Sequence, residues 1–246
     1  MEEKVLIVDF GSQYTQLIAR RIRELFIYCE IHPYNNVNVD LSTFKAIILS
    51  GSPFSVNSKD VLHYDLSSLK GKKPILGVCY GAQYIAHFDG GKVVGSDKRE
   101  YGRANLNFID NNSLLFKNID LGTQVWMSHG DTIESLPKNA KLIASTNDVL
   151  NAAYEIEEES IFGIQFHPEV YHTSQGKNII ENFLIGISKI KADWTPKSFS
   201  EKAIKEIKNK VGEDKVILGL SGGVDSSVAA VLLNKSIGKN LHCIFV

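Results

Sequence analysis

A cysteine bracketed by glycines is the first feature of this chain that indicates chemistry. Cys79 stands in the run Gly77–Gly81 (GVCYG), which follows an apolar segment ending at Val78 and precedes an apolar-rich stretch starting at Ala82. This is the strand, tight turn and helix of a nucleophile elbow, with cysteine in place of serine. Flanking glycines suit such a turn, because a Cβ there would collide with the strand or the helix. Cysteine is also a common core residue, so the elbow alone leaves a nucleophile and a space-filling side chain equally open.

A base and an orienting group for this nucleophile occur further along the chain. His167 follows an apolar run, and Glu169 lies two residues beyond it, across Pro168. A thiol needs a neighbouring base to act as a nucleophile, and a carboxylate can fix the tautomer of that base. Proline cannot continue a central strand, so His167 is expected at a strand end. Cys79, His167 and Glu169 are therefore a candidate catalytic triad.

These two motifs together resemble those of the class I, triad-type glutamine amidotransferases. The matching segments are GVCYGAQ at 77–83 and FHPEV at 166–170, and the resemblance covers residues 4 to about 190. It implies a flavodoxin-like α/β sheet, Cys79 as a nucleophile that forms a γ-glutamyl thioester, and no cofactor for this glutaminase half. His167 would act as base and acid, and Glu169 would orient it. The resemblance further implies backbone oxyanion donors at Gly51 and Tyr80, and glutamine contacts at Gln83 and, in a loop, at Ser128, His129 and Asp131.

A second run of small residues, SGGVDSS at 221–227, follows the buried strand expected at Lys215–Leu220. Small residues between a strand and a helix let backbone N–H groups surround a phosphate at the positive helix end. The run lacks the Gly-Lys-Ser/Thr ending of a P-loop and resembles the pyrophosphate loop of enzymes that split ATP to AMP and pyrophosphate. The resemblance implies that Asp225 holds Mg²⁺ or orients the loop. The implied ATP contacts are Ser221, Gly222, Gly223, Val224, Asp225, Ser226 and Ser227.

Alternating apolar and helical patterns predict the elements that position these residues. Strands that alternate with helices imply a mostly parallel sheet with helices on both faces. Buried strands are expected at Lys4–Phe10, Tyr28–Pro33, Phe44–Ser50 and Pro74–Val78, and helices at Tyr14–Phe26 and Asn178–Ile187. Shorter pieces predict an antiparallel addition at one edge, namely Ala104–Ile109, Gln124–Met127, Leu142–Ser145, Ala152–Ile156 and Ile161–Gln165.

The pattern divides the chain into residues 1–190, a polar linker at 191–197 and residues 198–246. Ser198 and Glu201 have the spacing of a capping box that would start a new helix. One strand, a helix from about Ser227 and a further strand follow, and a single such unit cannot bury both faces of a sheet. We therefore expect residues 198–246 to be the opening of an α/β ATP-pyrophosphatase domain that is incomplete here.

Composition limits the classes of partner and compartment. The net charge of −1 gives no electrostatic case for nucleic acid or an anionic membrane. The chain start lacks the basic and apolar regions of a signal peptide, and no stretch reaches the ~18 apolar residues of a membrane helix. Three cysteines are an odd and sparse set, which favours a reducing cytoplasm over a disulfide framework.

A triad amidotransferase followed by a pyrophosphate loop, in that order, resembles the glutamine-hydrolysing guanosine monophosphate (GMP) synthases. Local matches are DFGSQ at 9–13 and HPEVYHT at 167–173, where Tyr171 replaces the threonine of many relatives. The resemblance implies ATP and Mg²⁺ in the second domain, xanthosine monophosphate (XMP) as acceptor, and a homodimer at full length. The 246 residues alone are expected to bind glutamine and hydrolyse it slowly, but not to form GMP.

Two other interpretations remain open at this point. One is a glutaminase subunit of another enzyme, such as anthranilate or carbamoyl phosphate synthase, against which the pyrophosphate loop argues. The other is a non-enzymatic regulatory or binding module with a relic fold, against which the intact Cys79, His167 and Glu169 argue.

Overall fold

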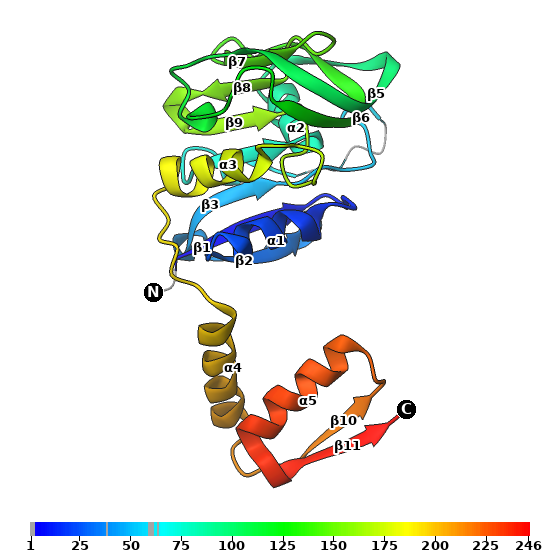
Figure 1. Cartoon of the computed structure of the whole chain (residues 1–246), viewed down its shortest axis with the longest axis vertical. Coiled ribbons are helices and arrows are strands. Elements are labelled where there is room, and N and C mark those ends of the chain that lie inside the picture. Colours follow the sequence, from blue (N-terminus) through cyan, green and yellow to red (C-terminus); the bar gives the residue numbers. More distant parts are fainter. Residues whose placement is uncertain (1–2, 38, 59–61, 63) are drawn as a thin grey trace. The chain divides into compact units, whose positions relative to one another are not determined.

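The computed structural model describes residues 3–37, 39–58, 62 and 64–246 and divides into two compact units, Met1–Asp193 and Trp194–Val246 (Figure 1). A nine-stranded sheet in the order β2-β1-β3-β4-β9-β8-β7-β5-β6 forms the centre of the first unit. Its parallel part comprises β2 (Tyr28–Pro33), β1 (Lys4–Asp9), β3 (Phe44–Leu49), β4 (Ile75–Val78) and β9 (Ile161–Ile164). Its antiparallel part comprises β8 (Ala153–Ile156), β7 (Lys141–Thr146), β5 (Lys92–Ile109) and β6 (Gln124–Ser135). The predicted α/β sheet with an antiparallel addition at one edge is confirmed, and the parallel part has the flavodoxin-like strand order 2-1-3-4-5. The placement of Ile161–Gln165 in the antiparallel addition is wrong, because β9 pairs parallel with β4 and antiparallel with β8 and so joins the two parts.

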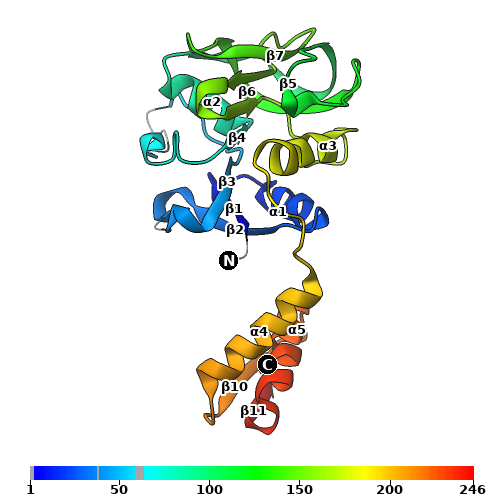
Figure 2. The same ribbon diagram turned by 90° about the vertical axis from the view of Figure 1, so that its left-hand side faces the viewer.

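Helices cover both faces of the parallel part (Figure 2). Helices α1 (Thr15–Glu24) and α3 (Gly176–Glu181) contribute to one buried cluster, and α2 (Tyr80–Phe88) contributes to the other. Successive residues of β1 alternate between the two clusters, with Ile7 in the first and Val8 in the second. Burial on both faces explains why the parallel strands are near-continuous apolar runs in the sequence.

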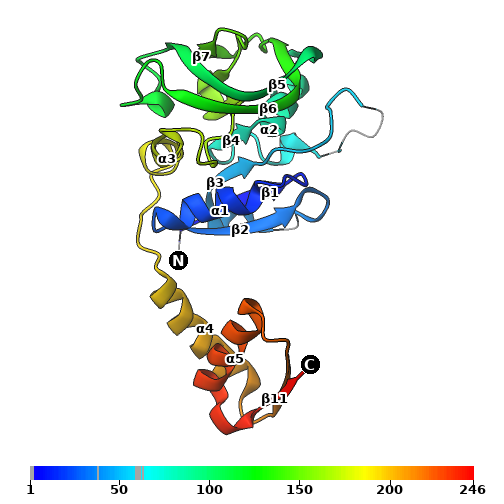
Figure 3. The same ribbon diagram turned by 45° about the vertical axis from the view of Figure 1, so that its right-hand side comes forward.

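The antiparallel part is longer than its sequence pattern predicts. Strands β5 and β6 form an extended ribbon of 18 and 12 residues, of which only Ala104–Ile109 and Gln124–Met127 were expected (Figure 3). The expected loop at Ser128–Asp131 is wrong, because these residues lie within β6, where Ser128 pairs with Tyr101 of β5. Cross-strand hydrogen bonds hold this polar segment extended without the apolar alternation that would reveal a strand.

The helix expected at Asn178–Ile187 is present with two geometries. Helix α3 begins at Gly176, and a π-helical segment, η6 (Asn182–Ile187), continues it. Phe183 and Leu184 of η6 are buried in the same cluster as α1. The prediction of an apolar-faced helix here is confirmed.

The second unit consists of α4 (Pro196–Val211), β10 (Val216–Leu220), α5 (Val224–Ile237) and β11 (Leu241–Phe245), with β10 and β11 parallel. The predicted cap of α4 is wrong: Thr195 caps the helix, and Ser198 is the reciprocal partner three residues later. Proline is favoured in the first helical turn, so residues 196–197 belong to the helix rather than to a linker.

Large apolar side chains of the second unit remain accessible. Ile217 of β10 is 71% exposed and Phe245 of β11 is 76% exposed, as expected for a single strand–helix–strand unit. In the described part of the chain, no helix combines the length and apolar character needed to cross a bilayer.

Candidate active site

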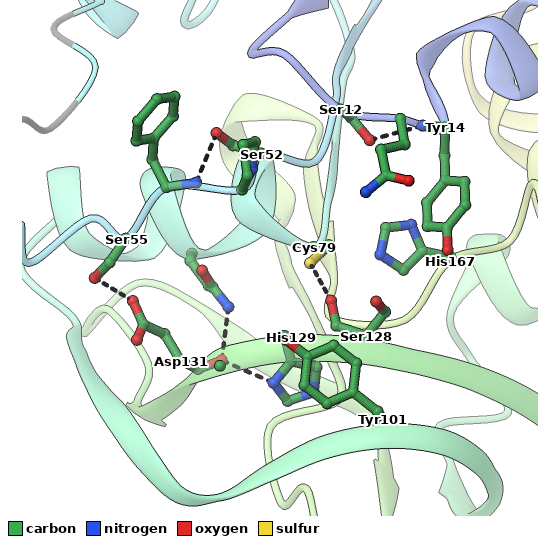
Figure 4. Close-up of a pocket in the computed structure, with 15 residues that line it drawn as sticks. Ser12, Tyr14, Ser52, Ser55, Cys79, Tyr101, Ser128, His129, Asp131 and His167 are labelled. Carbon is green, nitrogen blue, oxygen red and sulfur yellow. Dashed lines mark hydrogen bonds between the residues drawn. The ribbon is translucent and has the colours of Figure 1, made fainter.

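Four parallel strands lead into one pocket of the first unit. The segments that follow β1, β3, β4 and β9 contribute Ser12, Ser52, Cys79 and His167 to its lining. The carboxyl edge of an open α/β sheet is where such folds bind ligands. Residues 128–131 of β6 form the opposite wall (Figure 4). The cavity has a volume of about 560 Å³, a size suited to a small metabolite.

The turn at Cys79 has the geometry of a nucleophile elbow. Its backbone lies at φ 52° and ψ −105°, between the end of β4 and the first turn of α2. Residues other than glycine rarely adopt positive φ, and such strain clusters at functional sites. A Cβ on Gly77 would lie 2.7 Å from the Ala82 nitrogen, and one on Gly81 would lie 2.5 Å from the Leu49 oxygen. The flanking glycines are therefore required for the close approach of strand, turn and helix.

The structure brings the three candidate triad residues together. His167 Nδ1 lies 2.7 Å from Glu169 Oε1, and both side chains are buried. Two anchors hold this segment. The Thr173 hydroxyl donates to the His167 carbonyl at 2.5 Å, and Arg21 Nε donates to the Glu169 carbonyl at 3.0 Å. The sequence assigned no role to the Arg21 or Thr173 side chain. Each binds a backbone carbonyl, and such a contact leaves no pattern in the sequence.

Electrostatics at His167 favour the charged imidazolium. Burial alone would disfavour the charge, but the Glu169 carboxylate and the Cys79 side chain outweigh it, so the pKa of His167 lies well above its usual value. The Tyr14 ring packs against the imidazole in a T-shaped arrangement, with ring centroids 4.9 Å apart. An imidazolium beside a thiol promotes the thiolate form, which is the nucleophile.

The predicted oxyanion donors are the backbone N–H groups of Gly51 and Tyr80. Within the described residues, neither Gly51 nor Tyr80 donates its backbone N–H to a hydrogen bond. The Gly81 N–H donates to the Ser50 carbonyl at 3.1 Å, which joins the start of α2 to the end of β3. A Cβ on Gly51 would lie 3.3 Å from His167 Cε1, so this glycine lies against the imidazole. Free N–H groups in such a position can stabilise an oxyanion.

A hydrogen-bond network links Gln83 to β6. Gln83 Nε2 donates to the Asp131 carbonyl at 2.7 Å and to Gln165 Oε1 at 3.3 Å, so only its oxygen is left for a ligand. His129 Nδ1 donates to the same Asp131 carbonyl at 2.8 Å. Burial lowers the pKa of His129 to about 4, so this histidine is neutral near pH 7. The Asp131 carboxylate accepts a hydrogen bond from Ser55.

Sequence reasoning missed Gln165, which follows β9 and whose buried side chain contacts Gln83 and Cys79. Its Nε2 lies 3.9 Å from Cys79 Sγ. The apolar run expected to continue to Gln165 gave no signal for it, since the strand ends at Ile164 and the polar side chain follows in a bend.

The pyrophosphate-like run of the second unit surrounds a helix start. Helix α5 begins at Val224, so Val224–Ser227 lie in its first turn. The sequence pattern predicted that the helix would begin at about Ser227, with the residues before it in a loop. Gly222 has φ 78°, and Gly223 precedes the helix with its carbonyl accepting hydrogen bonds from the hydroxyls of Ser226 and Ser227. The helix start directs unpaired backbone N–H groups outward, which suits a phosphate.

The chain matches two family models. Residues 6–187 match the model of class I glutamine amidotransferases, and residues 198–246 match that of NAD synthase. A GMP synthase [glutamine-hydrolyzing] from Christiangramia forsetii is 66% identical over 246 residues, and one from Bacteroides fragilis is 57% identical. Each comparison covers 100% of this chain but 48% of the relative, so the chain spans about half the length of these proteins.

Solved structures share the fold of the first unit. One is a protein from Thermoplasma acidophilum, provisionally described as part of a GMP synthase, with 32% identity and a TM-score of 0.68. The match covers 77% of this chain and 95% of that one.

We predict that Gly81→Ala destabilises the elbow. The new Cβ would press on the backbone oxygen of Leu49, which cannot move without displacing β3, and overpacking of this kind costs about 1–3 kcal/mol. The melting temperature of the protein and the alkylation rate of Cys79 should both fall. The matched control is Gly186→Ala, where a Cβ meets no atom within 4 Å, and it should melt no lower than the unaltered protein. Equal melting of the two variants would contradict the prediction.

We predict that Glu169→Gln lowers the pKa of His167. The carboxylate favours the imidazolium, so the titration midpoint, followed by the imidazole C–H signals in NMR, should drop in the variant. Because the folded pKa is raised, the stabilising effect is complete below the unfolded value of about 6.5 and is lost as the pH rises through the folded value. The melting difference between the two proteins should therefore shrink with rising pH. The control is Glu158→Gln at an exposed position, and a midpoint unchanged by Glu169→Gln argues against the ion pair.

Proposed function

The chain belongs to the class I glutamine amidotransferase family, and from this premise we propose that it hydrolyses glutamine at Cys79 to supply ammonia for GMP synthesis. The observation that carries the proposal is the strained elbow that sets Cys79 beside the His167–Glu169 pair in a pocket of about 560 Å³. A relic binding module would have no need to retain backbone strain and a buried ion pair together, since both are costly.

In the proposed reaction, the Cys79 thiolate attacks the side-chain carbonyl carbon of glutamine. The carbonyl oxygen becomes an oxyanion facing the N–H groups of Gly51 and Tyr80. As the C–N bond breaks, the His167 imidazolium gives its proton to the leaving nitrogen, and ammonia departs from a γ-glutamyl thioester. His167 then takes a proton from water, hydroxide attacks the thioester, and glutamate leaves. Glu169 keeps the imidazole in one orientation throughout.

Recognition of the amino acid is assigned to the walls of the same pocket. Because both N–H groups of Gln83 are bound within the protein, its oxygen can accept a hydrogen bond from the substrate. The Asp131 carboxylate is placed to attract an α-ammonium group. Among the described lining residues there is no lysine or arginine, so backbone N–H groups and the hydroxyls of Ser52 and Ser128 are proposed to hold the α-carboxylate.

The second unit is proposed to begin an ATP site that splits ATP to AMP and pyrophosphate. Support comes from the helix start at Gly223 and from the NAD synthase model match. Mg²⁺ would neutralise phosphate charge there, and Asp225 is the carboxylate of the first turn that could hold it. No group of three or more potential metal ligands occurs within the described residues, so phosphate oxygens would supply other ligands.

The whole protein is proposed to aminate XMP to GMP, as a homodimer in the cytoplasm. The names of the relatives support the reaction, and three free cysteines support a reducing compartment. The exposed apolar side chains of β10 and β11 support completion of the second unit by further α/β structure. The helix-start site also favours this function over an anthranilate or carbamoyl phosphate system.

We predict that a diazoketone analogue of glutamine modifies Cys79 selectively. Burial raises the pKa of Cys29 to about 11, and Cys243 is exposed but belongs to the second unit and does not line the pocket. Peptide mass spectrometry should find label on Cys79, and excess glutamine should prevent it. His167→Ala should slow labelling and glutamate release by about 100-fold or more, whereas the matched variant His87→Ala, at an exposed position, should not. Equal labelling of the three cysteines, or labelling unchanged by His167→Ala, refutes the triad.

We further predict that the 246 residues release glutamate from glutamine without forming GMP from XMP, ATP and Mg²⁺. The reason is the incomplete burial of the second unit. Chromatography of the reaction mixture checks both products. GMP formation by these residues alone would contradict the proposal that they carry the glutaminase activity but not the synthesis of GMP.

A further inference from the structure

Gln165 contacts the reacting sulfur, and we propose that it is a further catalytic residue whose side-chain amide stabilises the Cys79 thiolate. The side chain is 0% exposed, and its Nε2 lies 3.9 Å from Cys79 Sγ. The inference deepens the proposed glutaminase function, on which it rests, because it concerns the same nucleophile.

The surrounding hydrogen bonds fix which end of the Gln165 amide faces the sulfur. A backbone carbonyl only accepts, so Gln83 must turn its NH₂ group toward the Asp131 carbonyl, at 2.7 Å. The other hydrogen of that nitrogen points to the Gln165 amide, at 3.3 Å, where it needs an acceptor. Gln165 therefore offers its oxygen to Gln83 and its own NH₂ group to Cys79.

This orientation favours the charged form of the nucleophile. A hydrogen bond donated to a charged group stabilises that form, and an amide that accepts at its oxygen becomes a stronger donor at its nitrogen. The Ser128 carbonyl lies 3.7 Å from the same sulfur and can accept only from the neutral thiol. The donor from Gln165 offsets this opposing contact.

Other charged and titratable groups around the pocket have separate effects. The His167 imidazolium favours the thiolate, and Glu169 acts through that imidazole. On β6, His129 is neutral and the Asp131 carboxylate is engaged by a hydroxyl. The Gln165 side chain is uncharged, so its replacement by another uncharged side chain changes the stability of the Cys79 thiolate without changing the charge of the site.

The test is the pH dependence of Cys79 alkylation by iodoacetamide in the Gln165→Met variant. The methionine side chain has nearly the same volume as glutamine but no hydrogen-bond donor. Loss of a hydrogen bond to a charged group should raise the midpoint of the rate profile by about one pH unit. Alkylation should be about tenfold slower below the midpoint and equal on the alkaline plateau. A role in packing alone would lower the plateau or the melting temperature and leave the midpoint in place.

The control is Gln16→Met on the exposed face of α1, which should leave the profile unchanged. An unshifted midpoint in folded Gln165→Met overturns the proposal. Where that variant does not fold, the unaltered protein labelled with ¹⁵N-glutamine decides. The Gln165 side-chain signals should move with the same midpoint as alkylation, and signals that stay still also overturn the proposal. Because iodoacetamide does not depend on glutamine binding, failure to hydrolyse glutamine would overturn the proposed function separately from this result.

Discussion

The close approach of β3, β4 and α2 at Cys79 is the constraint on which the site depends. The positive φ of Cys79 lifts its side chain out of the line of β4, and glycines at 77 and 81 let the backbones meet there. The same approach places the Tyr80 N–H at the helix start and the Gly51 N–H at the neighbouring strand end. The positions of the Cys79 side chain and of these two N–H groups thus follow from a single packing arrangement.

The parallel and antiparallel parts of the nine-stranded sheet contribute different walls of the pocket. The segments that follow the parallel strands bring Cys79 and His167 into the pocket, because the carboxyl ends of these strands share one edge. The antiparallel strand β6 supplies the opposite wall, with the Asp131 carbonyl accepting from both Gln83 and His129. Asp131 pairs with Gly95 of β5, so the position of its carbonyl, and with it the orientation of the Gln83 and Gln165 amides, depends on the pairing of these two strands.

The sequence predicted four of the five parallel strands and the grouping of Cys79, His167 and Glu169, because both have local signals. Buried strands are unbroken apolar runs, and the glycines at 77 and 81 bracket the nucleophile. The full lengths of β5 and β6 could not be predicted, since their charged and polar residues are held by pairing between segments distant in the chain. The contacts of Arg21 and Thr173 were equally hidden, because a side chain that binds a backbone carbonyl outside its own helix or strand leaves no periodic pattern.

The helix starts of the two units show why similar local patterns were predicted with different success. Both α2 and α5 follow a strand through a short turn with glycines in it or beside it, and both present N–H groups at their first turn. In α2 the preceding residue is the strained Cys79. The glycines on either side of it, which are required because a Cβ would clash there, mark the helix start in the sequence. In α5 the preceding residue is Gly223 in extended geometry, and the serines at 226 and 227 donate to its carbonyl from within the helix. Serine is typical of both loops and helix starts, so composition alone placed this boundary three residues too late, whereas the hydrogen bonds place Val224 to Ser227 in the helix.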